Sequence, residues 1–293
     1  MTQALPDAEE LGAVRAMARR GDLVEAGQRA VALRDRTPVG SLARGEATHL
    51  LGGIAFEQGR IEEAECHFEE AISIARGRGD AALAARATTN LGSIAHLRGK
   101  DTLALSLYRC ALIAWRDIGN AAGVAQVSHN LALVFREQGD LGAAAVAATR
   151  AVRAARESGD PARAGTVRLG QVEQALAEGA LARATGELDQ ARRCAEAARD
   201  GLGQAEAARL EGAIALAEGR FATALRRAGL GQRRALRLGG LQCASECAEL
   251  AFRASLMLRR VRSAQRFYHS AALGYSRLSA RPAQRRLETE RPA

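Results

Sequence analysis

Two asparagines, Asn90 and Asn130, stand at the same place in two predicted helices, each nine residues before a turn glycine. Asparagine is worse than alanine inside a helix by roughly 0.5 kcal/mol, because its side chain competes for backbone hydrogen bonds. A primary amide offers both a donor and an acceptor, which match the C=O and N–H of a peptide group. The two amides therefore either hold a bound peptide or simply face solvent. A pair of polar residues one helical turn earlier, Arg86 and Gln126, favours binding.

No pattern in the sequence indicates catalysis. There is no G-x-S-x-G, no H-E-x-x-H, no Walker loop and no dinucleotide-binding fingerprint. The five cysteines lack the CxxC spacing of zinc sites. We therefore expect no enzymatic activity, no cofactor and no metal site.

The composition is that of a helical protein, and its charge is unevenly spread. Aromatic residues are only 3% of the chain, and there are five prolines in 293 residues. Residues 1–220 contain 27 Lys and Arg against 29 Asp and Glu, whereas residues 221–293 contain 15 Arg against 4 Glu. The first residues lack the apolar region of a secretion signal, and no window resembles a membrane span. We expect a cytoplasmic protein with no membrane partner.

Turn residues recur along the chain with a period of forty. The glycines follow one another at 40-residue steps, and the glycine is lost in a seventh turn at Arg259-Arg260. An alanine follows five residues after each turn, and a second small residue usually follows seven residues later, which lets neighbouring helices approach closely. The turn glycines are Gly59, Gly99, Gly139, Gly179 and Gly219, with Gly21 before them.

Each period contains two stretches with helical apolar spacing, separated by turns. A single helix pair cannot bury its apolar face, so successive pairs must stack. The predicted fold is all-α, a right-handed superhelical solenoid of about seven helix-turn-helix repeats over residues 1–280. The repeats are predicted at approximately 4–40, 41–80, 81–120, 121–160, 161–200, 201–240 and 241–280. The Arg-rich tail 281–293 is predicted to be disordered, since it has few apolar residues to bury.

The repeat resembles the tetratricopeptide repeat (TPR). The match lies in "HLLGGIAFEQGRIEEAECHFEEAISIA" and "NLGSIAHLRGKDTLALSLYRCALIA". These segments carry a Leu-Gly pair, the turn glycine, an alanine, an aromatic residue (Phe68 or Tyr108) and a second alanine. The forty-residue period is similar to the long subtype of kinesin light chains and of sensor arms in bacterial regulators. The resemblance covers roughly residues 6–280 and is weaker after Pro161.

In TPR folds the first helix of each pair lines the concave face, and an inward Asn holds the backbone of an extended peptide. Arg and His beside it can bind acidic side chains or a free carboxylate. The resemblance therefore implies a peptide-binding set on the first helices of repeats two to four. Its members are Asn90, Asn130, Arg86, Gln126, His49, His96, His129 and Arg136.

The inward positions of the later repeats are mostly apolar, with charged residues among them. We interpret this stripe as core or as a self-association surface, with a hydrophobic binding trough as the alternative. The apolar members are Leu169, Leu176, Leu210, Leu216, Leu250, Leu256 and Met257, and the charged ones are Glu173, Arg209, Glu246, Glu249 and Arg253.

Taken together, the sequence predicts an adaptor or regulatory scaffold that binds a protein or peptide, with preference for an acidic partner or a free carboxylate. One alternative is a module that senses a small molecule or a signalling peptide. A second is weak nucleic-acid binding through the Arg-rich C-terminal quarter. That quarter lacks interleaved aromatic residues and known motifs, so we do not expect a nucleic-acid partner.

Overall fold

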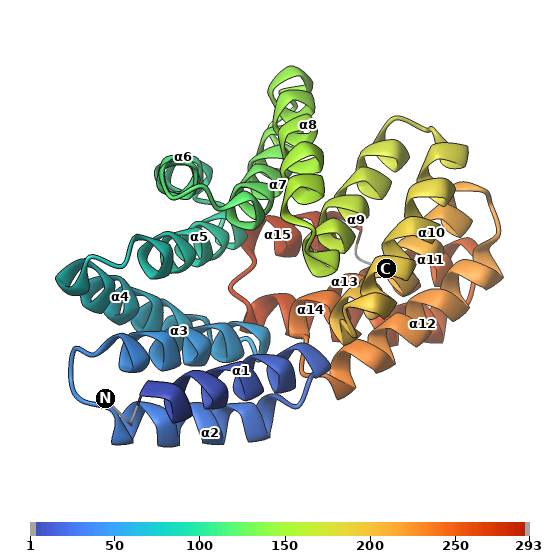
Figure 1. Cartoon of the computed structure of the whole chain (residues 1–293). Coiled ribbons are helices and arrows are strands. Elements are labelled where there is room, and N and C mark those ends of the chain that lie inside the picture. The colour runs from blue at the N-terminus through green and yellow to red at the C-terminus, as the bar shows by residue number, and fades with distance from the viewer. Residues whose placement is uncertain (1–3, 291–293) are drawn as a thin grey trace. The chain divides into compact units, whose positions relative to one another are not determined.

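A computed structural model describes residues 4–290, and within that range it contains fifteen helices and no strand (Figure 1). The first fourteen helices follow one another as seven pairs, so the predicted all-helical repeat fold is confirmed. Their bounds are α1 (Ala4–Arg20), α2 (Leu23–Arg36), α3 (Leu42–Glu57), α4 (Ile61–Arg78), α5 (Ala81–Leu97), α6 (Asp101–Asp117), α7 (Ala121–Glu137), α8 (Leu141–Ser158), α9 (Pro161–Ala177), α10 (Leu181–Ala197), α11 (Gly201–Ala217), α12 (Phe221–Arg237), α13 (Leu241–Met257), α14 (Val261–Arg277) and α15 (Arg281–Thr289).

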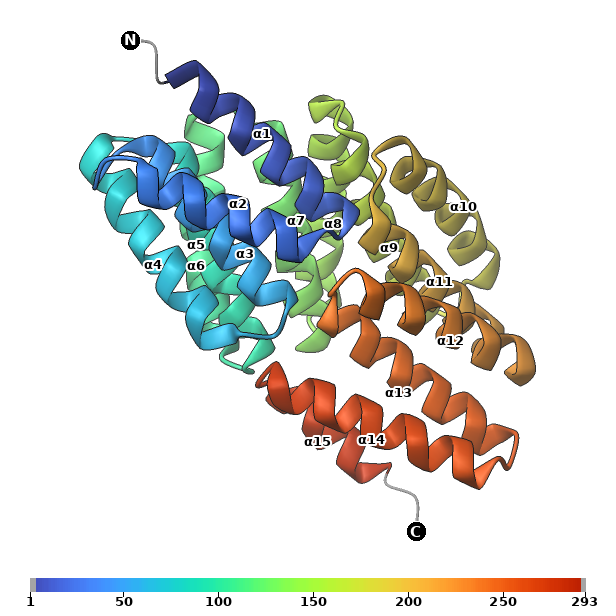
Figure 2. The ribbon, with the colours of Figure 1, turned by 90° about the horizontal axis from the view of Figure 1, so that it is seen from below.

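The chain divides into two compact units, with the boundary between Ala154 and Ala155 inside α8. In unit 1 each helix from α1 to α6 packs against the helix that follows it. In unit 2 the same holds for each helix from α9 to α14. Figure 2 shows α12, α13 and α14 of unit 2 as neighbours, in agreement with their packing.

The first helices of successive pairs begin at matched capping residues. The side chains of Asp80, Asn120, Asp160 and Asp200, each forty residues from the last, accept a hydrogen bond from a backbone N–H in the first turn of the helix that follows. The donor–acceptor distances are 2.8–2.9 Å. Such caps satisfy backbone donors that a helix end leaves unpaired, and they fix where each pair starts.

The turns inside the pairs use residues with positive φ. Gly99 has φ 73°, and the N–H groups of Gly99 and Lys100 return to carbonyl groups of the preceding helix. Arg259 replaces the expected glycine and has φ 55°, so the seventh turn keeps its left-handed shape without a glycine. A non-glycine residue in this conformation costs roughly 1–2 kcal/mol.

The small residues predicted from the period are buried where helices cross. Ala64, Ala104, Ala184 and Ala224 have no exposed surface. The Leu-Gly pairs have a distinct role: a Cβ added at Gly92 would lie 2.6 Å from the ring of Tyr108, and one at Gly52 would lie 2.6 Å from the ring of Phe68. The glycine of each pair therefore makes room for an aromatic side chain on the second helix.

The C-terminal segment differs from the prediction of a disordered tail over 281–293. Residues 281–289 form α15, and Leu287 is 1% exposed. Arg286 and Glu290 pair with Glu249 and Arg253 of α13. Composition alone missed this helix, because its one buried leucine and two ion pairs depend on neighbours far away in sequence. Residues 291–293 lie outside the described part of the chain.

In the range that the structure describes, every helix is too short or too polar to cross a membrane.

Candidate functional site

The first helices α3, α5 and α7 lie against one another in unit 1. Polar side chains at matching positions on them contact each other from one pair to the next. We call this set the polar ladder, and it consists of Glu46, His49, Arg86, Asn90, Ser93, Gln126 and Asn130.

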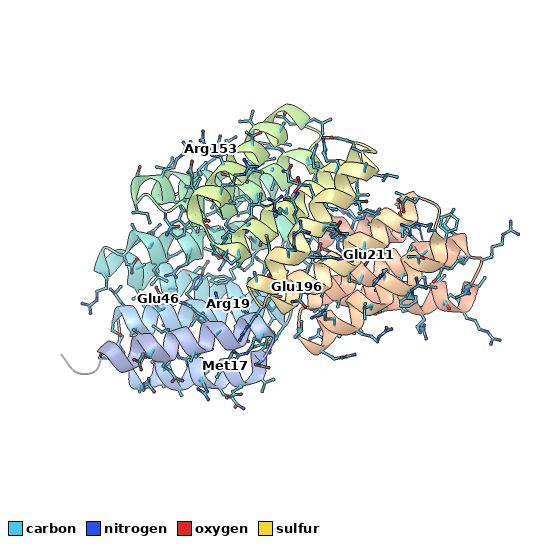
Figure 3. The ribbon with its side chains drawn as sticks, turned by 45° about the vertical axis from the view of Figure 1, so that its right-hand side comes forward. Met17, Arg19, Glu46, Arg153, Glu196 and Glu211 are labelled. Atoms are coloured by element: carbon cyan, nitrogen blue, oxygen red, sulfur yellow. The ribbon has the colours of Figure 1, made fainter. Side chains whose placement is uncertain are left out.

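Glu46 joins three helices at one end of the polar ladder. Its Oε2 atom accepts a hydrogen bond from Arg15 Nη2 of α1 at 2.5 Å, and its Oε1 atom pairs with Arg86 Nη2 of α5. The Glu46 side chain is 16% exposed, whereas those of Arg15 and Arg86 are 38% and 32% exposed. Two guanidinium groups therefore share one carboxylate, and this end keeps a net positive charge that solvent can reach. Figure 3 labels Glu46 on α3.

His49 and Asn90 form the next contact. Asn90 Nδ2 lies 3.1 Å from His49 Nε2. Burial, followed by the positive charges of Arg86 and Arg15, lowers the pKa of His49 to about 3. The ring is therefore neutral at physiological pH, and Asn90 donates to its unprotonated Nε2. The Asn90 Oδ1 atom accepts no hydrogen bond from the described residues.

Asn130 lies at the other end of the polar ladder and contacts two side chains. Its Oδ1 accepts from Gln126 Nε2 at 3.0 Å, and its Nδ2 donates a long hydrogen bond of 3.5 Å to Ser93 Oγ. Ser93 Oγ also accepts from the hydroxyl of Tyr108 at 3.1 Å. Burial raises the pKa of Tyr108 to about 12, so this phenol remains a donor.

His96 belongs to a different cluster at the end of α5. Its Nδ1 lies 3.3 Å from Asp101 Oδ1, and its Nε2 lies 3.5 Å from Glu137 Oε2. Burial alone would lower the pKa of His96, but Glu137 and Asp101 outweigh it and raise the pKa above its usual value. No contact joins His96 to the polar ladder among the described side chains.

The structure thus does not bring the eight predicted site residues together in one group. Arg86, His49 and Asn90 lie together, and so do Gln126 and Asn130, whereas His96 binds two carboxylates elsewhere. His129 and Arg136 are half-buried on α7, and each interacts with a neighbouring group.

Sequence reasoning missed Arg15, Ser93 and Tyr108 as partners. The contacts that join the polar ladder across helices link residues 37 to 41 positions apart, close to the repeat length. A search for complementary side chains at that spacing would have found Glu46 with Arg86. It would not have found Arg15, because the first repeat is shorter and its residue lies 31 positions from Glu46.

The matching face of unit 2 carries an ionic cluster around Arg209 of α11. Arg209 contacts Glu173 of α9 at 2.6 Å, Glu246 of α13 at 3.3 Å and Glu206 of its own helix. Burial raises the pKa of Glu246 to about 7, Arg209 opposes this, and Glu206 and Glu173 reinforce it. At the helix positions that correspond to the polar ladder, unit 2 therefore has more carboxylates than guanidinium groups, whereas unit 1 has more guanidinium groups than carboxylates.

The predicted apolar stripe of the later repeats is only partly a core. Leu210 and Leu250 are buried, but Leu256 and Met257 are 39% and 57% exposed. The charged residues between them are paired with one another. The described His, Cys, Asp and Glu side chains form no group of three or more that could hold a metal ion.

Comparisons with known proteins agree with the helical-repeat fold. Residues 83–157 match the family model described as "Tetratricopeptide repeat". None of the curated proteins matches the sequence.

Two solved structures are similar in fold. A Rap protein, solved in complex with competence and sporulation factor, has a TM-score of 0.69 and 16% identity, with 99% of this chain and 78% of that chain covered. BtubC (BKLC) from P. vanneervenii has a TM-score of 0.50 and 19% identity, with 77% of this chain and 92% of that chain covered.

The matched segment runs from near the start of α5 to near the end of α8, so it covers the third and fourth helix pairs almost completely. Beyond it, helix pairs with the same forty-residue step continue in both units. This repeat class and fold support, in general terms, a protein-binding scaffold or regulator. Over residues 83–157 the chain is similar to tetratricopeptide repeat proteins, and its fold is similar to that of the Rap protein.

Proposed function

We propose that this protein is an adaptor or regulatory scaffold that binds an extended segment of a partner on the polar ladder of unit 1. The observation that carries the proposal is the ladder itself. Three successive first helices present polar groups at repeated positions, and the Asn90 side chain retains an acceptor that no described residue uses. An amide in this position can bind the N–H of an extended chain.

The charge of the polar ladder indicates what the bound segment contains. Arg15 and Arg86 share the single carboxylate of Glu46 and are both partly exposed. Because His49 is neutral, the remaining positive charge belongs to the two arginines. An acidic side chain or a C-terminal carboxylate near Arg86 would form charge-assisted hydrogen bonds with them.

The similarity to the Rap protein supports the proposal at the level of fold. That protein was solved in complex with competence and sporulation factor, so a helical-repeat fold of this kind can hold a factor. The identity of 16% transfers no residue role to this chain.

The test begins with selection of binding 12-residue peptides from a random displayed library by the full chain. Affinities for the selected peptides are then measured by calorimetry. Asn90→Ala/Asn130→Ala should weaken binding by about tenfold or more, since each lost amide contact is worth about 1–2 kcal/mol. The matched control, Gln28→Ala/Gln138→Ala, removes two exposed amides of unit 1 outside the polar ladder and should bind like wild type.

The same double variant also tests whether the amides are structural. Each loses a hydrogen bond worth about 1 kcal/mol but gains helix propensity of roughly 0.5 kcal/mol, so thermal melting should change little. Wild-type affinity in the double variant, or selection of peptides without acidic residues, would contradict the proposal. Unfolding of the double variant would show that Asn90 and Asn130 serve the fold alone.

A further inference from the structure

The outer faces of α12 and α14 carry positive charge alone. Neither Phe221–Arg237 nor Val261–Arg277 contains an Asp or Glu. Among the residues that the structure describes, no carboxylate lies within salt-bridge distance of five exposed arginines on these helices. They are Arg226, Arg233, Arg237, Arg262 and Arg266. By contrast, Arg227 on the inner side of α12 pairs with Glu211, which Figure 3 labels on α11.

The two helices present these charges as one surface. Gln232 Nε2 of α12 donates to Ser270 Oγ of α14 at 2.9 Å, so the helices are neighbours. Arg226 and Arg266 occupy the same position of successive repeats, as do Arg233 and Leu273. We call the five arginines, with the exposed apolar residues between them, the α12–α14 basic face.

Apolar side chains interrupt the arginines on this face. Leu230, Leu236, Val261 and Leu273 are 43%, 55%, 59% and 66% exposed. Large apolar residues are also exposed on the second helices α2, α6 and α8, whereas α4 and α10 expose none. On the α12–α14 basic face they stand among arginines that have no carboxylate partner among the described residues. Solvation of a charged surface does not require exposed leucines, whereas a docking surface uses them.

We propose that the α12–α14 basic face is a docking site for an acidic amphipathic helix of a partner protein. The carboxylates of such a helix would pair with the arginines, and its apolar side chains would cover Leu230 and Leu273. Charge complementarity identifies the occupant as anionic, and the leucines identify it as a protein. Nucleic acid fits less well, because the aromatic residues nearby are half-buried and engaged: Phe267 lies beneath Arg266, and Tyr268 packs against Phe252.

The test measures fluorescence anisotropy of a labelled 18-residue helical peptide, with Glu on one face and Leu on the other, against the full chain. The comparison ligands are a peptide of the same composition in scrambled order, a 20-base-pair DNA duplex and phosphatidylglycerol vesicles. The protein variants are Arg226→Gln/Arg266→Gln and Leu230→Gln/Leu273→Gln. The matched control is Arg109→Gln/Arg193→Gln, which removes two exposed arginines from the second helices α6 and α10. Circular dichroism verifies that each variant is folded.

The amphipathic peptide should bind at least tenfold more tightly than the scrambled one. Binding should weaken at least tenfold in the arginine variant and at least threefold in the leucine variant, and it should stay within twofold in the control. Asn90→Ala/Asn130→Ala should also bind this peptide normally, which separates the site from the polar ladder. Absence of binding, equal binding of the scrambled peptide, or no effect of the leucine variant would overturn the proposal. Tighter binding of DNA or vesicles would overturn it as well.

Discussion

At the scale of residues, the contacts of the polar ladder explain why asparagine stands inside two helices despite its low helix propensity. Asn90 donates to His49 of the preceding repeat. Asn130 accepts from Gln126 of its own helix and donates to Ser93 of the preceding repeat, so both amides connect neighbouring repeats. Two histidines of unit 1 experience opposite environments. Arginines surround the neutral His49, whereas carboxylates surround His96.

His96 should stabilise the protein at low pH. Its pKa is raised in the folded state, so its contribution is fully present below about pH 6.5, the unfolded value, and is lost as the pH rises through the raised pKa. His96→Gln should therefore unfold more easily than wild type at pH 5.5, by roughly 0.5–1 kcal/mol, and should match wild type at pH 9. Urea titrations at the two pH values measure the difference. A constant difference at both values would contradict the assignment.

His49 should act in the opposite direction. Its pKa is about 3 in the folded state, so the stability that it confers is present above about pH 6.5 and is lost as the pH falls toward 3. Between pH 7 and pH 4.5, wild type should lose about 1–2 kcal/mol more of its unfolding free energy than His49→Gln. His67→Gln on α4 is the control for removing a histidine from unit 1. Parallel losses in wild type and His49→Gln would show that the ring does not resist protonation.

At the scale of elements, the helix pairs α3–α4 and α5–α6 depend on close approach at a glycine. Gly52 faces the ring of Phe68, whereas the neighbouring Gly53 has no atom within 4 Å of an added Cβ. Gly52 therefore has no room for a side chain, whereas the adjacent Gly53 has room for one, although the sequence alone does not distinguish the two.

Substitution of these two glycines should change stability in opposite directions. Gly52→Ala should destabilise the protein by about 1–3 kcal/mol, because the ring of Phe68 must move. Gly53→Ala should stabilise it by roughly 0.5–1 kcal/mol, because alanine is the better helix former and nothing is displaced. Chemical denaturation followed by circular dichroism measures both. A destabilised Gly53→Ala would indicate a contact on the inner face that the structure does not contain.

Much of the arrangement of helices and turns could be predicted from the sequence, because it depends on the local spacing of residue types. The forty-residue step, the turn glycines, the alanines at crossings and the pairing of helices all follow from residue types at fixed intervals. The partners of individual polar residues could not be predicted. Whether Arg86 binds a ligand or Glu46 depends on how helices forty residues apart are set against each other. The helix α15 was missed for the same reason.

At the scale of the whole molecule, α15 closes the end of the last repeat. Glu249 of α13 is only 5% exposed, and it accepts hydrogen bonds from Arg286 at 2.9 and 3.0 Å and from the Tyr275 hydroxyl at 2.5 Å. These contacts hold the pKa of Glu249 below its usual value in spite of burial. A repeat protein needs such an end, because each repeat otherwise leaves one apolar side uncovered.

Loss of Leu287 should release this closing helix. Leu287→Ala removes the buried side chain of α15 and should cost about 2 kcal/mol or more locally. Hydrogen exchange of amides 281–289 should then accelerate, with a smaller effect in α13 and α14. Leu256→Ala on α13 is the control, since that leucine is already 39% exposed. Unchanged protection in Leu287→Ala would show that the two ion pairs alone hold α15.

The polar contacts between neighbouring repeats also have an evolutionary consequence. Glu46 with Arg86, His49 with Asn90, Glu173 with Arg209 and Glu249 with Arg286 join residues 36 to 41 positions apart. Mutation of one partner leaves the other unpaired in a neighbouring repeat, so substitutions at these positions should arise in pairs among relatives. Duplication or deletion of one internal repeat would mismatch such pairs at the new junction, which favours descendants that keep the number and order of their repeats.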